Sequence, residues 1–322
     1  MYMKTCKQIL FLPLLLLSLC SAAQKVNSGE DDRLFDNAIV LNNLVDQDLD
    51  IGKVIDDEDS ANHDSGIKAT YAREIRDVIL DKQLECYQRI VDSFPGSKLY
   101  FRALNNKASV EYQLEDYEAA RKTYKAILAG NADDKERGGT GSGLMAEPYA
   151  NYKNRAATML AGLYMRDSNY REALNYLDLT RKYPYRHFCG NEYAANDIYM
   201  AGLYARCYLG LKNYEKAYDI LLPQLLNSGL ASNTELVRMA YDALLLRYTR
   251  ARLKASFEKA FRDYRVEKIK DRKDEYDRFT ISFLGRTIPL STWSFDFQEE
   301  RQKKEAIVKM MTNAAFYALI SK

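Results

Sequence analysis

Three short stretches decide the fold: Asp116–Ala120 (DYEAA), Asn169–Ala173 (NYREA) and Asn213–Ala217 (NYEKA). Each begins with Asp or Asn, continues with tyrosine and ends on alanine. A further alanine stands nine residues before each tyrosine; these are Ala108, Ala161 and Ala205. Apolar residues flank the stretches at helical intervals, which predicts three helical hairpins. The alanines would let paired helices approach closely, the tyrosine would fill the space at the turn, and Asp or Asn would cap the second helix.

This spacing resembles the tetratricopeptide repeat family over about residues 70–226. The resemblance implies an α-solenoid, and it implies architecture rather than a particular function. The steps from tyrosine to tyrosine are 53 and 44 residues, against about 34 in the usual repeat. The additional residues fall in 130–149 and 183–194. The first insertion contains Gly138–Gly143, and we expect this glycine-rich stretch to be a flexible connector. It lacks the Gly-Lys-Ser/Thr ending of a phosphate-binding loop, so we do not expect it to bind a nucleotide.

An earlier, partial unit precedes these three. Leu84, Tyr87 and Ile90 share one face of a helix, and Phe94–Ser97 (FPGS) is expected to end it. The segment resembles the second helix of a tetratricopeptide unit.

The amino terminus has the composition of a secretory signal peptide. Lys4 and Lys7 precede the apolar run Ile9–Leu19, and small residues follow at 21–23. The run is shorter than the about 20 apolar residues that span a bilayer. Two processing routes remain open: cleavage after Ala23, or lipidation at Cys20 in a sequence that resembles a bacterial lipobox but has Leu19 in place of a small residue.

Charge is unevenly distributed, although the formal net charge is only +2. Residues 24–70 hold 12 acidic and 4 basic residues, a net of −8, which predicts an exposed or partly disordered arm. Residues 247–278 hold 12 basic and 7 acidic residues, a net of +5. Both segments are expected to be solvated faces, with docking of the arm on the basic segment or a membrane-surface role as alternatives.

The carboxy-terminal part departs from the repeat. We expect helices at about Asn233–Leu246, Arg247–Arg278 and Glu299–Ser321. Between the last two, residues 279–297 alternate apolar and polar side chains, which predicts a β-hairpin or extended arm. It would cap the last helix pair, or its Trp293 would be an aromatic docking site.

The expected organisation is therefore mainly α, with an α-solenoid of tetratricopeptide-like hairpins and a small carboxy-terminal hairpin and capping helix. The expected boundaries are 1–23 for the signal peptide, 24–66 for the acidic arm, 67–230 for the repeats and 231–322 for the capping region.

The sequence offers little to a catalytic or metal site. It has two histidines, His63 in the arm and His187 in a loop, and no paired Cys-x-x-Cys or Gly-x-Ser-x-Gly motif. Cys86, Cys189 and Cys207 are expected to be small buried residues, with a Cys189–Cys207 bridge as the alternative. We expect no enzyme activity, no cofactor and no metal.

These features predict a protein-binding scaffold or adaptor, exported to the periplasm or outer membrane of a bacterium, with an envelope or secreted protein as partner and no nucleic acid. One alternative is a lipoprotein of outer-membrane protein assembly, which the helix endings Phe94-Pro95 and Tyr183-Pro184 loosely resemble. The other is a glycan-binding envelope protein, based on the 25 tyrosines. Expected partner contacts lie on the first helix of each pair and on the aromatic segment: Asn105, Asn106, Glu111, Arg155, Met159, Tyr199, Arg206 and Trp293.

Overall fold

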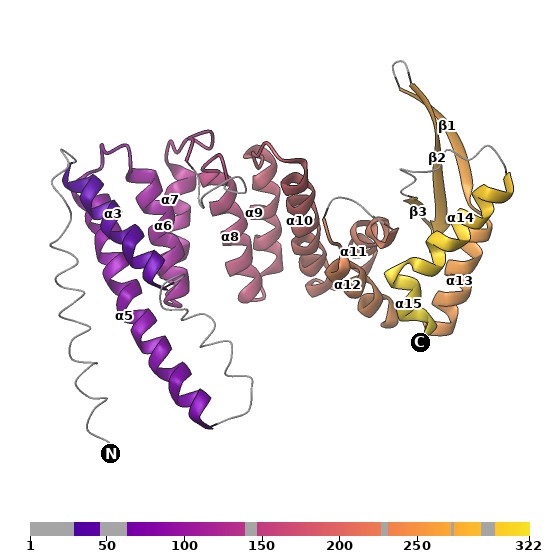
Figure 1. Cartoon of the computed structure of the whole chain (residues 1–322), viewed down its shortest axis with the longest axis horizontal. Coiled ribbons are helices and arrows are strands. Elements are labelled where there is room, and N and C mark those ends of the chain that lie inside the picture. The colour runs from indigo at the N-terminus through magenta and orange to yellow at the C-terminus, as the bar shows by residue number, and fades with distance from the viewer. Residues whose placement is uncertain (1–28, 46–62, 139–146, 227–230, 272–273, 291–299) are drawn as a thin grey trace. The chain divides into compact units, whose positions relative to one another are not determined.

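The computed structural model describes residues 29–45, 63–138, 147–226, 231–271, 274–290 and 300–322. Within these residues the chain is 72% helix, with twelve α-helices and one small three-stranded sheet, which confirms the mainly helical class. Contacts divide the chain into two compact units, residues 1–133 and 134–322. Figure 1 shows their elements. No helix in the described ranges is both long enough and apolar enough to cross a bilayer.

The first unit contains four helices: α3 (Glu30–Asn43), α5 (His63–Ser93), α6 (Tyr100–Gln113) and α7 (Tyr117–Ala129). Helix α5 packs against both α3 and α6, and α6 forms a hairpin with α7. The predicted face of α5 is confirmed, because Tyr87 and Ile90 are fully buried and Leu84 packs against the same core. The helix ends at Ser93, directly before the Phe94–Ser97 turn.

Part of the segment expected to be an exposed arm is a packed helix. Phe35, Ala38 and Leu41 of α3 are buried at helical spacing. At the start of α3, the Ser97 hydroxyl donates to Asp31 Oδ2 at 2.6 Å, and this bond lowers the pKa of Asp31. Three acidic residues in the first turn also suit the positive end of the helix dipole. Four of the segment's twelve acidic residues, Glu30, Asp31, Asp32 and Asp36, therefore belong to a helix with an apolar face, and the acidic run at 46–59 lies outside the described residues.

The second unit begins with two helical hairpins. Helix α8 (Tyr152–Arg166) pairs with α9 (Tyr170–Lys182), and α10 (Gly190–Gly210) pairs with α11 (Tyr214–Leu221). Helix α9 also packs against α10, so that the helices follow one another side by side in Figure 1.

The turns of the three predicted hairpins share one geometry. After the first helix, one residue adopts left-handed φ: 61° at Glu115, 58° at Ser168 and 57° at Lys212. The next residue donates its N–H to the carbonyl five residues back, which is the Schellman ending of a helix. The side chain of that same residue then accepts an N–H from the second helix, three residues ahead; these residues are Asp116, Asn169 and Asn213.

The alanines that define the spacing are all fully buried, as expected for close helix packing: Ala108, Ala161, Ala205, Ala120, Ala173 and Ala217. The turn tyrosine reaches the following hairpin in the second unit. The ring of Tyr170 lies against Gly210 at the end of α10, where an added Cβ would stand within 2.6 Å of ring carbons. Glycine at position 210 therefore makes room for the tyrosine of the preceding hairpin.

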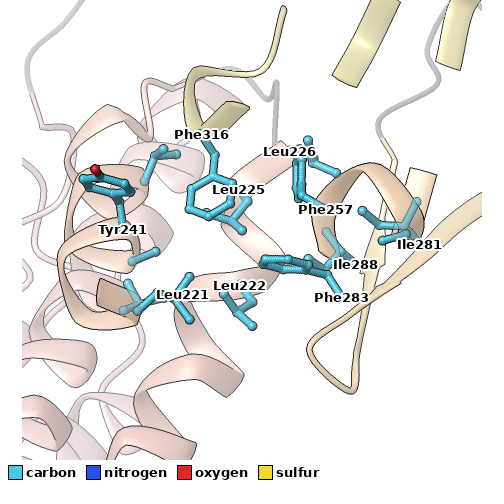
Figure 2. Close-up of a cluster of buried hydrophobic side chains, with 14 of the residues drawn as sticks. Leu221, Leu222, Leu225, Leu226, Tyr241, Phe257, Ile281, Phe283, Ile288 and Phe316 are labelled. Atoms are coloured by element: carbon cyan, nitrogen blue, oxygen red, sulfur yellow. The ribbon is translucent and has the colours of Figure 1, made fainter. Parts of the chain in front are cut away.

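The rest of the second unit is a different module. Its elements are the 3₁₀ helix η3 (Leu222–Leu226), α12 (Thr234–Leu245), α13 (Arg250–Arg262), β1 (Arg265–Asp271), β2 (Asp274–Phe283), β3 (Arg286–Pro289), α14 (Glu300–Asn313) and α15 (Ala315–Ser321). The strands are antiparallel in the order β1-β2-β3. Their core, drawn in Figure 2, centres on Phe257, Phe283 and Phe316, whose ring centroids lie 5.2–5.8 Å apart.

The predicted hairpin is confirmed in its described part. Phe279, Ile281 and Phe283 are buried on one face of β2, and Leu284-Gly285 turns the chain into β3. The basic helix expected over Arg247–Arg278 is wrong beyond Arg262. Its Lys, Glu and Arg residues favour helix locally, but β1 pairs in register with β2, which the apolar core holds, and this pairing overrides local preference.

Two further observations concern the module's edges: one differs from the prediction and one agrees with it. The last helix, expected as one piece, breaks at Ala314, whose extended backbone separates α14 from α15. The hairpin lies against the last repeat-like pair, as expected of a cap. Arg286 donates to Asp219 Oδ1 at 2.9 Å and to Glu215 Oε2 at 2.8 Å, and Arg247 donates to Glu215 Oε1 at 2.6 Å.

A candidate binding groove built by the insertions

The two insertions predicted from the repeat spacing meet in the second unit. The described ends of the first insertion close on each other, because Arg137 and Tyr149 form an antiparallel bridge and Ala150 N–H donates to Glu136 O at 2.9 Å. Residues 139–146, with most of the expected flexible connector, lie outside the described residues.

Asn151 joins this insertion to the second one. Its side-chain Nδ2 donates to Arg186 O at 3.0 Å, and its Oδ1 accepts from Arg186 N at 2.9 Å. The residue is fully buried and holds left-handed φ of 51°, a conformation that asparagine tolerates better than most residues. A single amide therefore fixes the second loop at the start of α8.

Asp134 and Asn154 complete this junction. Asp134 Oδ1 accepts the backbone N–H of Lys153 at 2.7 Å and so caps α8 from outside the helix. Burial raises the pKa of Asp134, although its bonds to backbone N–H groups and the cations of Lys153 and Arg186 act in the opposite direction. Asn154 donates to Tyr183 O at 2.7 Å, which holds the end of α9.

The second loop continues into an unusually long helix. Helix α10 has 21 residues, whereas α6 has 14 and α8 has 15. Residues 190–201 include no buried position, and burial begins at Gly202. Tyr193 of this exposed half accepts His187 N–H at 3.0 Å and donates to His187 O at 2.6 Å, so the loop and the helix extension support each other.

A groove of about 270 Å³ lies between the extension of α10, the end of α9 and the second loop. Its lining combines three tyrosines with amide, hydroxyl, charged and apolar side chains: Asn154, Thr180, Arg181, Pro184, Tyr185, Tyr193, Asn196, Asp197, Met200 and Tyr204. The groove therefore offers aromatic surface and several hydrogen-bonding groups in one concave place, as ligand sites commonly do.

Two tyrosine rings are held by specific neighbours. Tyr185 stacks on His187 at 6.1 Å between ring centroids and meets Tyr193 edge-on at 6.0 Å. Tyr204 donates to Asp178 Oδ1 at 2.9 Å, and the Arg181 guanidinium lies 5.5 Å from the centre of its ring. The rings are thus fixed in place before any ligand arrives.

The surroundings of Tyr185 and Tyr204 raise the pKa of both phenols. Burial raises the pKa of Tyr185 to about 12, and the carboxylates of Glu147 and Glu192 act in the same direction while Arg155 opposes them. Burial also raises the pKa of Tyr204 to about 12, with the bond to Asp178 adding to the effect. Both phenols are therefore neutral hydrogen-bonding groups at physiological pH.

A second, shallower groove of about 500 Å³ lies between the turn of α10 and α11 and the outer face of α12. Its apolar part includes Leu209, Tyr214, Met239 and Leu246, and Leu246 is 66% exposed. The charged residues Arg238 and Asp242 of its lining pair with each other.

The contacts predicted on α6 are wrong for two residues. Asn105 and Glu111 are buried, at 8% and 4% exposure. Glu111 forms an ion pair with Lys107, whose Nζ also donates to Thr123 of α7. A buried polar group needs a partner. The Asn105 amide donates to Asn106 Oδ1, and Lys107 donates to Oε1 of Glu111. Asn106 is half-buried and donates to Tyr87 OH at 3.1 Å.

The other predicted contacts lie near the groove or elsewhere in the second unit. Arg155 pairs with Glu147 close to Tyr185, Met159 is partly buried, Tyr199 is 51% exposed, and Arg206 pairs with Glu235 of α12. None of them lines the groove. Trp293 and Cys20 lie outside the described residues.

The groove residues were missed because none of them is an alanine or tyrosine position of the repeated motif. Pro184, Tyr185 and Tyr193 lie in the second insertion, and the others lie on α8, α9 and α10. The two long steps between tyrosines were the available signal. Cys189 and Cys207 are free thiols, so no bridge joins them, and Cys207 is fully buried whereas Cys86 and Cys189 are half-buried. In the described parts of the chain, no three His, Cys, Asp or Glu side chains gather as metal ligands would.

No protein-family model matches the chain, and no curated protein matches it closely enough to count as a relative.

Proposed function

We propose that this chain is an exported, non-enzymatic scaffold that binds other proteins at the bacterial cell envelope, and that its tetratricopeptide-like hairpins form an α-solenoid. The main support for this proposal is the groove between α9 and α10. Its tyrosines, amides and mixed charges are the side chains that recur in protein-binding sites, and its preformed rings would lose little freedom on binding.

The repeated turn supports the architectural half of the proposal. Three hairpins end their first helix with the same left-handed residue and cap their second helix with the next residue. Hairpins with one common geometry stack in a regular way, and the contact of the Tyr170 ring with Gly210 is such a stacking contact. Repeat arrays of this kind usually act by presenting extended binding surfaces.

A glycan-binding function is the second candidate, because three tyrosines line the groove. A sugar needs open ring faces. His187 covers one face of Tyr185, and Arg181 covers one face of Tyr204. The amide-rich lining with Asn154 and Asn196 also suits a peptide backbone, whose N–H and C=O groups need alternating acceptors and donors. These observations favour a polypeptide.

The test is crosslinking in the native membrane fraction followed by mass spectrometry of copurified proteins. Wild type is compared with Asn196→Trp, which would fill the groove, and with Ala195→Trp, which adds the same bulk at the neighbouring exposed position. We expect a partner protein that wild type and Ala195→Trp retain and Asn196→Trp loses. Absence of any retained protein, or equal retention by all three, contradicts the proposal.

A Cys20→Ala variant in the same experiment tests attachment. If the protein is lipid-anchored, the variant leaves the membrane fraction while wild type stays. If it is cleaved after Ala23, both fractionate alike.

A further inference from the structure

We infer that the groove between α9 and α10 receives a positively charged segment of the partner polypeptide, with a lysine or arginine side chain among the tyrosines. The inference rests on the proposed protein-binding function and specifies the chemistry of its ligand.

Two of the carboxylates beside the groove are paired. Glu147 pairs with Arg155, and Asp178 lies 3.7 Å from Arg181 while accepting the Tyr204 hydroxyl. These pairs neutralise the two arginines that approach the groove. Lys153 and Lys182 lie over the ring of Tyr183, which is not a lining residue.

Two other carboxylates have no cationic partner among the described residues. Asp197 lines the groove and is exposed. Glu192 stands five residues earlier on α10, close enough to Tyr185 to raise the pKa of its phenol. Asp197 is therefore an unpaired negative charge in the lining, and Glu192 is a second one beside Tyr185, outside the lining. A cationic ligand group would complement them, whereas an acidic one would be repelled.

The aromatic lining favours the same ligand. Tyr185 and Tyr193 meet edge to face beside these carboxylates, and the faces of tyrosine rings attract ammonium and guanidinium groups. The molecule itself shows the preference: Arg181 lies over Tyr204 within this groove. A lysine or arginine between Tyr193 and Asp197 would combine both attractions in a partly desolvated place.

The test uses the mature full-length chain and three short fluorescein-labelled peptides, of serine alternating with lysine, glutamate or glutamine. Fluorescence anisotropy at low salt measures their affinities. We expect the lysine peptide to bind, and the glutamate and glutamine peptides to bind more weakly. Glu192→Gln and Asp197→Asn should each weaken lysine-peptide binding about 2- to 5-fold, the scale of one exposed ion pair. Tyr193→Leu should weaken it by a similar factor through the lost cation–π contact.

Glu267→Gln is the matched control, because Glu267 is an exposed carboxylate on β1 of the same unit. It should leave binding unchanged. The sharpest variant is Asp197→Lys, which should lose the lysine peptide and gain the glutamate peptide. Melting curves check folding, and Asp197→Asn gives a milder test of the same charge.

Four outcomes overturn the inference: equal binding of all three peptides, preference of wild type for the glutamate peptide, binding of soluble peptidoglycan fragments but of no peptide, or variants that bind as wild type does. If the membrane-fraction experiment still shows a partner that depends on the groove, only the ligand's charge is wrong. If that partner is absent as well, the proposed function fails with it.

Discussion

The side-chain amide of Asn151 pairs with both backbone polar atoms of Arg186, its Nδ2 lying 3.0 Å from Arg186 O and its Oδ1 lying 2.9 Å from Arg186 N. Arg186 lies in the second insertion, and Asn151 follows the first one, directly before α8. Their pairing holds the second loop, and hence Tyr185 and the start of α10, in the position that forms the groove. The groove is therefore a product of the departures from the repeat, supported by the regular helices around it.

Replacing Asn151 should lower the free energy of unfolding and loosen the groove. Asn151→Gly keeps the left-handed backbone accessible but removes the amide, so we expect a loss of about 1–3 kcal/mol from the unsatisfied groups of Arg186. Asn151→Ala should cost about 1–2 kcal/mol more, because it adds left-handed strain. Urea unfolding measures both. Asn175→Ala, at an exposed asparagine of α9, is the control, and equal losses for it and Asn151→Ala would contradict this account.

The contact between Tyr170 and Gly210 can be tested by a double-mutant cycle. Gly210→Ala should destabilise by about 1–3 kcal/mol, because its Cβ would overlap the Tyr170 ring. In a Tyr170→Ala background the same change should be neutral or stabilise by about 0.5–1 kcal/mol, since alanine favours helix over glycine. Additive effects of the two substitutions in thermal or urea unfolding would show that the ring does not occupy this place.

The cysteines should differ in reactivity. Burial raises the pKa of the Cys207 thiol to about 11, so at neutral pH it is a buried, protonated thiol. We expect maleimide to modify the half-exposed Cys189 in the native protein and to reach Cys207 only in concentrated urea. Mass spectrometry of alkylated peptides over time measures this. Equal native rates, or a Cys189–Cys207 disulfide that blocks both, would contradict the structure.

The groove tyrosines predict a loss of stability at high pH. Burial raises the pKa of Tyr185 and Tyr204 from 10.0 to about 12 in the folded state. The protonated phenols therefore contribute stability that is fully present below pH 10 and is lost as pH rises from 10 through about 12. The double variant Tyr185→Phe/Tyr204→Phe should lose less stability over this range in urea unfolding. If the stability of the variant falls with pH as steeply as that of wild type, these two tyrosines are not buried as described.

The repeated turn could be predicted from sequence because it depends on local chemistry. Asp116, Asn169 and Asn213 cap the next helix through their own side chains. The spacing of the alanines predicts the close packing of two helices that are neighbours in the sequence. The alternation of Phe279, Ile281 and Phe283 was readable for the same reason, since it directly reflects one buried face.

The missed features depend on contacts between distant segments. Strand β1 follows from its register with β2, which its Lys- and Glu-rich sequence does not indicate. Helix α3 was hidden by its acidic residues, although Phe35, Ala38 and Leu41 carry a helical spacing. The groove requires a contact between Asn151 and Arg186, which are 35 positions apart in the sequence. No local sequence pattern predicts such a contact.

The most direct test of the central claim, that the insertion-built groove contacts a partner polypeptide, is site-specific photocrosslinking in the producing cell. A photoreactive phenylalanine analogue is placed at Asn196 in the groove or at Arg171, an exposed position on α9 that does not line it. We expect a crosslinked protein from position 196 that is absent from position 171 and that excess lysine peptide suppresses. The same crosslink from both positions, or from position 171 alone, would contradict it.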